Sequence, residues 1–311
     1  HNTLGMVLTK TGRREEALEA LRRAVRLAPD HAEAGYNLGN ALWADGKYSE
    51  AVACYRHVIE KNPGFSPAHN ALGKALIVTE KKAAAMEAFR RAIELDPSLA
   101  PAHFYLGTLL KEAGDTVQAA QALERAVRHD PDHADAHNNL GLVYLKLDRV
   151  DDAVTVFQAI LKLDQSLIPD SSRVRYHSNL GLALIKQKHF TEAEKVLRLA
   201  QALAPDSPEV LSNLGLALGN LGRLEEALSV LHKTLEQHPD YVEAFISLGA
   251  GRAEPSSSVR DTRVRTTVNP WPSSQRQRSN FLSTGGTRIS VRWASGSMTT
   301  QCPPARKARK Q

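Results

Sequence analysis

Histidines recur along the chain at intervals that could mark a row of metal ligands. His69, His103 and His137 follow one another at spacings of 34 residues, and His1 and His177 belong to the same series. Packed helices lie about 8–10 Å apart, whereas a zinc–imidazole bond is about 2 Å long, so neighbours in this column would not readily share one ion. We therefore expect these histidines to be partly buried packing residues.

Paired carboxylates are the second set of side chains that could do chemistry. The pairs Glu15–Glu16, Asp151–Asp152 and Glu225–Glu226 lie at the starts of amphipathic segments, where negative charge favours the helix dipole. No phosphate-binding loop, H-E-x-x-H, G-x-S-x-G or C-x-x-C motif accompanies them. We therefore expect no catalytic residues, no metal and no cofactor, and we expect that the protein is not an enzyme.

Composition narrows the class of protein further. The 311 residues are 42% hydrophobic and 24% charged, and alanine and leucine dominate, which favours a folded helical protein. No apolar run is long enough for a membrane helix, no signal peptide is apparent, and Cys54 and Cys302 lie far apart. These features indicate a cytoplasmic location. Because the chain begins with His1 rather than methionine, we expect its natural N-terminus to be missing.

Charge divides the chain into two predicted parts. Residues 251–311 hold 12 Lys+Arg and 2 Asp+Glu, whereas residues 1–250 hold 28 and 32. The C-terminal part is rich in Ser, Arg, Thr and Pro and has no helical period, so we interpret it as a basic low-complexity tail that is either disordered or spurious. Its aromatic residues, Trp271, Phe281 and Trp293, are scattered, which makes nucleic-acid binding an unfavoured third interpretation.

Residues 1–250 are built from a repeated pattern. A Leu-Gly pair is followed by alanine twelve residues after the glycine and, in all units but the fifth, by proline after 24 residues. The glycines are spaced by 34 residues, apart from one interval of 40. They are Gly5, Gly39, Gly73, Gly107, Gly141, Gly181 and Gly215; the alanines are Ala17, Ala51, Ala85, Ala119, Ala153, Ala193 and Ala227.

This pattern resembles that of the tetratricopeptide repeat family, whose 34-residue unit is a helix–turn–helix. The resemblance implies an all-α fold, a right-handed α-solenoid of antiparallel helix pairs with about seven units and a partial eighth beginning at Val242. We expect Gly12, Gly46, Gly114 and Gly222 to end first helices in the left-handed conformation. We also expect small residues where the two helices cross, so that a side chain larger than methyl at Ala51 or Ala153 would clash.

Unit five contains six extra residues, near residues 168–173. We interpret them as a longer loop between units, and an extra turn at the end of the preceding second helix stays open as an alternative. A local break of the superhelix could accompany this insertion.

The resemblance also implies where a partner would bind, because positions 2, 5, 6, 9, 12 and 13 of the first helix line the concave groove in this family. Position 6 carries asparagine in four units, similar to the asparagine ladder of O-linked N-acetylglucosamine transferases. An amide can pair with a peptide backbone of any sequence, although asparagine is also common there without such a role. The predicted binding residues are Asn37, Asn139, Asn179 and Asn213 of the ladder; Tyr36, Asn40, Trp43, Asn70, Lys74, Phe104 and Lys111 from units two to four; and Leu142, Leu145, Leu182, Ile185 and Leu216 from units five to seven.

Two functions follow from these observations. The first is a non-catalytic scaffold that binds an extended peptide or a partner helix in its groove, with no small-molecule substrate and no membrane. The alternative is a substrate-recruiting or regulatory fragment of a larger enzyme, either a glycosyltransferase similar to O-linked N-acetylglucosamine transferase or a bacterial kinase. A carboxylate clamp of the type found in some members of the family is not expected, because Asn37 and Asn40 match it in part but no adjacent unit supplies basic residues at positions 2, 5 and 6.

Overall fold

The computed structural model describes residues 1–241. The predicted partial eighth unit from Val242 and the predicted tail, residues 251–311, lie outside the described residues. The part of the chain that is described contains fourteen α-helices and one short 3₁₀-helix, and no strand.

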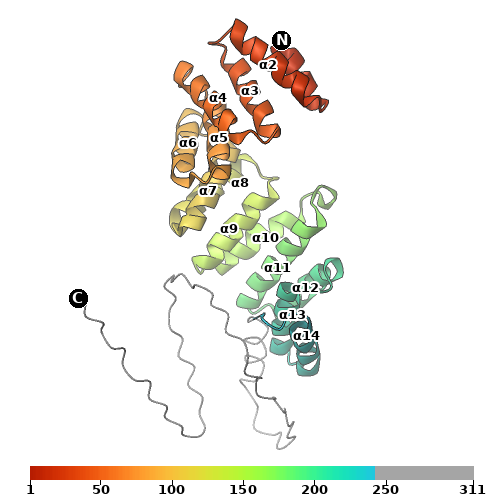
Figure 1. Ribbon diagram of the computed structural model, residues 1–311. Helices are drawn as coiled ribbons and strands as arrows, with labels where there is room; N and C mark the ends of the chain where they lie inside the picture. The colour runs from red at the N-terminus through yellow and green to blue at the C-terminus, as the bar shows by residue number, and fades with distance from the viewer. Residues whose placement is uncertain (242–311) are drawn as a thin grey trace, which may run out of the picture. The chain divides into compact units, whose positions relative to one another are not determined.

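The helices form seven antiparallel pairs that follow one another in a solenoid, as the resemblance implied (Figure 1). Each pair packs on the next, so no unit has to cover its apolar face alone. The pairs are α1 (Asn2–Lys10) with α2 (Arg14–Leu27), α3 (Ala32–Ala44) with α4 (Tyr48–Lys61), α5 (Ser66–Val78) with α6 (Lys82–Leu95), α7 (Ala100–Ala113) with α8 (Thr116–His129), α9 (Ala134–Lys146) with α10 (Val150–Leu161), α11 (Asp170–Lys186) with α12 (Phe190–Leu203), and α13 (Pro208–Asn220) with α14 (Leu224–Gln237).

The repeated glycine lets the two helices of a unit approach closely. A Cβ built on Gly141 would lie 2.5 Å from the Cε1 and Cζ atoms of the buried Phe157 ring. The glycine of every other unit is equally tight against the residue sixteen positions later: Leu21, Tyr55, Phe89, Leu123, Leu197 or Leu231. Ala51 and Ala153 are fully buried at the same crossing, in agreement with the predicted need for small residues.

The turn between the helices of a unit requires one left-handed residue. Gly12, Gly46, Gly114 and Gly222 have φ between 76° and 88°, which confirms the prediction for these four units. The remaining described turns place Glu80, Asp148 and Lys188 in the same conformation, with φ between 60° and 65°. A side chain at positive φ carries some strain, so the geometry of the turn is imposed by the packing of the helix pair and not by the turn residue.

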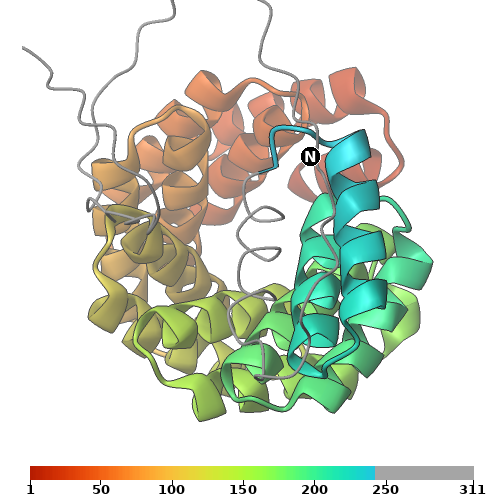
Figure 2. The same ribbon diagram turned by 90° about the horizontal axis from the view of Figure 1, so that it is seen from below.

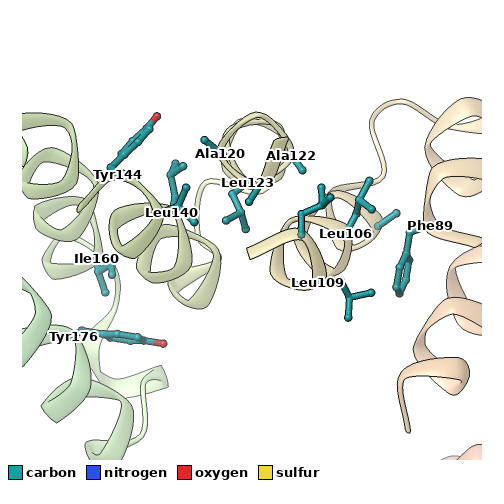
Figure 3. Packing of buried hydrophobic residues seen from close by; sticks show 14 of the residues in the cluster. Phe89, Leu106, Leu109, Ala120, Ala122, Leu123, Leu140, Tyr144, Ile160 and Tyr176 are labelled. Carbon is teal, nitrogen blue, oxygen red and sulfur yellow. The ribbon is translucent and has the colours of Figure 1, made fainter. Parts of the chain in front are cut away.

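One hydrophobic core runs through most of the array. It is made from leucine, alanine and aromatic side chains of both helices, and it passes from one unit to the next. Figure 3 shows part of this succession, from Phe89 past Leu106, Leu123 and Leu140 to Tyr176. Because each unit supplies and covers part of the same core, the stability of a unit depends on its neighbours.

The insertion in unit five does not lengthen the second helix. Helix α10 has 12 residues where other second helices have 14, and it is followed by the 3₁₀-helix η1 (Gln165–Leu167). The extra turn belongs to the next first helix, α11, which starts directly after Pro169 and has 17 residues. Proline fixes its own φ and cannot continue a helix from the preceding residues, so a new helix begins after it.

The predicted local break of the superhelix is also absent at this point. Helices α10 and α11 pack against each other, as do α9 and α11, and the core contains both Ile160 before the insertion and Tyr176 after it.

The first helices lie on the inner side of the curve that the array describes. Each first helix contacts the first helix of the next unit, all the way from α1 to α13, while second helices pack mainly on first helices. In a curved solenoid, equivalent helices of neighbouring units lie closer together on the concave side than on the convex side. Figure 2 shows the helix pairs following this curved path.

Candidate functional site

The first helices present one continuous row of side chains toward the inside of the curve. We call it the inner face and define it as positions 5, 6, 9 and 12 of each unit, a set that includes every predicted binding residue. It consists of Asn2, Thr3, Met6 and Thr9 of α1; Tyr36, Asn37, Asn40 and Trp43 of α3; Asn70, Ala71, Lys74 and Ile77 of α5; Phe104, Tyr105, Thr108 and Lys111 of α7; Asn138, Asn139, Leu142 and Leu145 of α9; Ser178, Asn179, Leu182 and Ile185 of α11; and Ser212, Asn213, Leu216 and Gly219 of α13.

The asparagines at position 6 join neighbouring units. Asn37 donates its Nδ2 hydrogen to Asn2 Oδ1 at 3.0 Å, and Asn179 donates to Asn138 Oδ1 at 2.8 Å. Asn213 donates in the same way to Ser178 Oγ at 3.2 Å. In each case the acceptor is the position 5 side chain of the preceding unit.

Asn139 departs from this scheme because position 5 of the preceding unit is Phe104, which offers no acceptor. Its Nδ2 donates to Thr108 Oγ1 at 3.1 Å, and its Oδ1 accepts from Lys111 Nζ at 2.7 Å. Asn139 is thus the most fully bonded of the four asparagines.

These bonds leave part of each amide available. A side-chain amide has two N–H hydrogens and a carbonyl oxygen. Within residues 1–241, Asn37 and Asn213 each use one N–H, and their carbonyl oxygens accept no hydrogen bond. Both side chains are half-buried, whereas Asn179 is 7% exposed. The asparagine ladder therefore links neighbouring units, and the carbonyl oxygens of Asn37 and Asn213 remain able to accept hydrogen bonds from a partner.

The acceptors on the preceding helix were not predicted from the sequence. Asn2, Asn138 and Ser178 are polar residues at position 5, each one unit before a position 6 asparagine. That paired spacing could have indicated them. Ser178 also donates to Glu209 Oε1 at 3.2 Å.

An aromatic cluster occupies units two to four of the inner face. The Lys74 ammonium lies 5.8 Å from the ring centroids of both Trp43 and Tyr105, so three successive units meet at this lysine. The Trp43 ring also makes an edge contact with Tyr48 at 4.9 Å. In the sequence Tyr105 only interrupts the asparagine ladder, and the structure adds it to the candidate site.

The other predicted residues of these units are held by neighbours. Asn40 accepts a hydrogen bond from the hydroxyl of the buried Tyr55 at 2.8 Å. The Tyr36 ring packs edge-on against Phe65 at 5.6 Å, and the Phe104 ring lies 4.5 Å from His133. Asn70 differs, because its buried Oδ1 has no hydrogen-bond partner within residues 1–241.

Units five to seven give the inner face a different character. Position 9 carries Leu142, Leu182 and Leu216, all half-buried, where units two to four carry Asn40, Lys74 and Thr108. The inner face therefore changes from aromatic and polar to aliphatic along the array. Such a surface is suited to anchoring apolar side chains of a partner.

Comparison with known families agrees with this architecture. Family models described as tetratricopeptide repeat match residues 2–64, 36–100 and 105–168, residues 184–250, and residues 88–121. The chain belongs to the tetratricopeptide repeat family. No curated protein sequence matches it.

Solved structures share the tetratricopeptide fold with this chain. They include PilF of Pseudomonas aeruginosa (TM-score 0.57, 22% identity, 70% of this chain and 97% of that one). A second is the C-terminal part of a TPR repeat-containing protein from Cytophaga hutchinsonii (TM-score 0.59, 16% identity, 80% and 99%). A third is the Cut9–Hcn1 hetero-tetramer of the APC/C (TM-score 0.56, 20% identity); the match covers 80% of this chain and 48% of the matched chain. At these identities the likeness shows the fold alone.

The histidine column joins successive tetratricopeptide repeats. His69, His103 and His137 are buried, and each Nε2 lies 2.8–2.9 Å from the carbonyl oxygen of the proline six residues earlier. A carbonyl can only accept, so Nε2 carries the proton in each ring. His177 bonds instead through Nδ1 to Arg173 O at 2.6 Å, because unit five has Gln165 in place of the proline and the insertion lies between that position and His177. The predicted packing role is confirmed for these four, whereas His1 is exposed.

Residues 1–241 contain no group of three or more His, Cys, Asp or Glu side chains arranged to hold a metal ion. None of the helices described is long and apolar enough to cross a membrane.

The insertion borders a pocket of about 580 Å³ between the loop before α9 and the start of α11. Two of its three carboxylates are engaged, because Asp135 accepts from Arg175 and Tyr176 and Asp164 accepts from Ser166, whereas Asp132 has no hydrogen-bond partner within residues 1–241.

Acidification is expected to destabilise the array through His103. Burial lowers the pKa of this imidazole below its ordinary value, and its buried Nδ1 has no hydrogen-bond partner within residues 1–241. The unfolded chain takes up a proton as the pH falls through about 6.5, whereas the folded protein resists protonation. The contribution of His103 is therefore complete above pH 6.5 and is lost as the pH falls below it.

Urea unfolding at about pH 7.5 and about pH 5.5 measures this effect. His103→Gln, whose amide can replace the Nε2–H bond to Pro97, should show a smaller loss of stability at the lower pH than the parent protein. His57→Gln, at an exposed position, is the matched control and should behave like the parent. An unchanged pH dependence in His103→Gln would contradict the prediction.

Proposed function

We propose that the inner face binds an extended peptide segment of a partner protein. The family and the solenoid fold support a protein-interaction scaffold in general terms, and the inner face supports the finer statement. The observation that carries the proposal is the row of asparagines on the inner side of the curve, in which the half-buried Asn37 and Asn213 keep carbonyl oxygens that accept no hydrogen bond within residues 1–241. Residues 1–241 offer no feature that favours the alternative of an enzyme's recruiting fragment.

The chemistry of an extended peptide fits this row. An extended backbone presents N–H and C=O groups at regular intervals, and it gains affinity by pairing them with fixed donors and acceptors. The asparagines are held in place by their bonds to the preceding unit, so little side-chain entropy is lost on binding. The half-buried leucines and aromatic rings between them supply apolar contact.

Replacing Asn139, Asn179 and Asn213 together by alanine tests the proposal. A photo-crosslinking side chain at Leu142 first identifies the partner segment, with the same side chain at the exposed Leu199 of α12 as the matched control. Affinity for that segment is then measured by fluorescence anisotropy. Each lost hydrogen bond is worth about 0.5–1.5 kcal/mol, so we expect a loss of about tenfold or more in affinity.

The asparagines also bond between units, so a structural effect must be separated from a binding effect. Ser178→Ala removes the acceptor of Asn213 but keeps the asparagine, and it should lower the urea midpoint without a comparable loss of affinity. Circular dichroism confirms that each variant is folded. If the folded triple variant binds the segment as tightly as the parent protein, the proposed role of the asparagines is wrong.

A further inference from the structure

The inner face has a charge pattern unlike that of the chain around it. At positions 5, 6, 9 and 12 of the seven described units, Lys74 and Lys111 are the only charged residues. Positions 2 and 13 border them, and the carboxylates at these positions are Glu33, Glu112, Asp135 and Glu209. Residues 1–250 as a whole hold more acidic than basic residues, 32 against 28. Glu112 pairs with Lys82 and Asp135 pairs with Arg175, whereas no carboxylate of the described residues pairs with Lys74 or Lys111. These two cations are therefore left for an anion of a partner.

Aromatic rings hold the Lys74 ammonium in place, but no negatively charged side chain of residues 1–241 neutralises it. Its ammonium lies between the rings of Trp43 and Tyr105, and no carboxylate of the described residues pairs with it. Contacts with aromatic rings attract the cation only weakly when it is accessible to solvent, by about 0.5–1 kcal/mol each. The rings therefore hold the ammonium in place and leave its hydrogens for a carboxylate.

Lys111 lies on the next first helix and is also incompletely satisfied. It donates one hydrogen to Asn139 Oδ1 at 2.7 Å, and an ammonium has three. Burial lowers the pKa of this ammonium, so its charge is partly removed from water. The adjacent Glu112 turns to Lys82, which it contacts at 2.7 Å. A carboxylate bound at Lys111 would thus replace the interactions with water that the ammonium group loses through burial.

Beyond Lys111 the inner face becomes aliphatic. Leu142, Leu182 and Leu216 follow one another at position 9 of successive units, the position that Lys74 occupies in unit three. First helices that contact each other lie about 8–10 Å apart, and a peptide in the extended polyproline II conformation advances about 3.1 Å per residue with about three residues per turn. One unit therefore corresponds to about three residues of such a peptide, and side chains three residues apart point to the same side.

We propose that the occupant of the inner face is a peptide with acidic residues at one end and aliphatic residues at the other, each about three residues apart. The carboxylates face Lys74 and Lys111, and the aliphatic side chains face Leu142, Leu182 and Leu216. This inference rests on the proposed function and specifies the partner of the same face.

Two other occupants fit the charges and contacts less well. Residues 251–311 of this chain carry 12 basic and 2 acidic residues, which is the wrong sign for Lys74 and Lys111. A nucleic acid offers negative charge along its whole length, but the aliphatic half of the inner face supplies neither cations nor aromatic rings for it.

Designed peptides test the inference on the full chain. The probe has glutamate at positions 1 and 4, leucine at positions 7, 10 and 13, serine elsewhere, capped ends and a fluorescent label. It is made in both orders, because the structure does not fix its direction. Matched probes carry glutamine or lysine in place of glutamate. We expect the glutamate probe in one order to bind about tenfold more tightly than its glutamine counterpart, the effect of a charge-assisted hydrogen bond.

Charge reversal on the protein gives the decisive measurement. Lys74→Glu with Lys111→Glu should lose the glutamate probe and gain the lysine probe, while the fold is checked by circular dichroism. The matched control is Lys195→Glu with Lys162→Glu, two exposed lysines off the inner face, which should leave the order of affinities unchanged. Added salt should weaken only the charged probes.

The remaining outcomes separate this inference from the proposed function. Equal binding of all three probes would overturn the acidic preference and leave peptide binding intact. Tight binding of a thirteen-residue oligothymidylate that is lost in the charge-reversed protein, without binding of the glutamate probe, would overturn it in favour of nucleic acid. Failure of every probe would also overturn it, and the crosslinking test at Leu142 would then decide separately whether the face binds a peptide.

Discussion

Phe157→Ala is expected to lower the free energy of unfolding by about 3–5 kcal/mol, the usual cost of deleting a buried aromatic ring. Phe157 is 1% exposed and lies at the crossing of α9 and α10 in the middle of the array. Its removal leaves a cavity that the rigid helix pair cannot close. Urea unfolding followed by circular dichroism measures the change in midpoint.

The position of Phe157 adds a second expected result. A solenoid is held together by contacts between neighbours, so weakening unit five weakens the coupling between units one to four and units six and seven. Unfolding should then depart from a single transition. The matched control is Leu199→Ala on the second helix α12, which is 56% exposed and should change stability by no more than about 0.5 kcal/mol. An effect of Phe157→Ala as small as that of the control would refute the prediction.

Gly141→Ala is the second change with a large expected effect. The new methyl group would lie 2.5 Å from two carbon atoms of the Phe157 ring, a distance that real Cβ atoms do not tolerate. Because the ring is enclosed by the core, the two helices must separate, and we expect a loss of about 1–3 kcal/mol. Alanine has a higher helix propensity than glycine, which by itself would stabilise α9. The expected loss of stability therefore comes from the clash with Phe157.

A glycine outside the crossing provides the control for this substitution. A methyl group added at Gly64 would have no atom within 4 Å, and this glycine has no positive φ, so Gly64→Ala should be neutral or slightly stabilising. Combining Gly141→Ala with Phe157→Ala tests the geometry directly, because the methyl would enter the space that the ring leaves. The double variant should be more stable than the sum of the two single effects predicts. Strict additivity would show that the residues do not meet as described.

The chain alone determined the repeated unit and most of its packing. The spacing of glycine, alanine and proline predicted seven helix pairs, small buried residues at the helix crossing such as Ala153, and the left-handed turn at Gly114, and all are confirmed. These features are local, because each depends on contacts within one helix–turn–helix unit. Within such a unit, residues at a constant separation in the sequence occupy equivalent positions in space. The packing role of the histidine column was also predicted, and it holds for His69, His103, His137 and His177 but not for the exposed His1.

Features that depend on neighbouring units needed the tertiary structure. The sequence left open an extra turn of the second helix at the insertion, and the structure places that turn at the start of α11. Identical asparagines have different partners, since Asn213 reaches Ser178 while Asn139 finds Thr108 and Lys111. The predicted binding role of these asparagines stays a prediction.

On the inner face, too, the sequence shows some features and only the tertiary structure shows the others. In the sequence, Lys74 is one polar residue among several, and Tyr105 is an interruption of the asparagine ladder. Packing of α3, α5 and α7 brings Trp43 and Tyr105 to both sides of Lys74. Spacing within one unit determines which side chains face inward, because a helix repeats every 3.6 residues. Only the rotation between successive units decides which inward side chains meet, and that rotation is a property of the packed array.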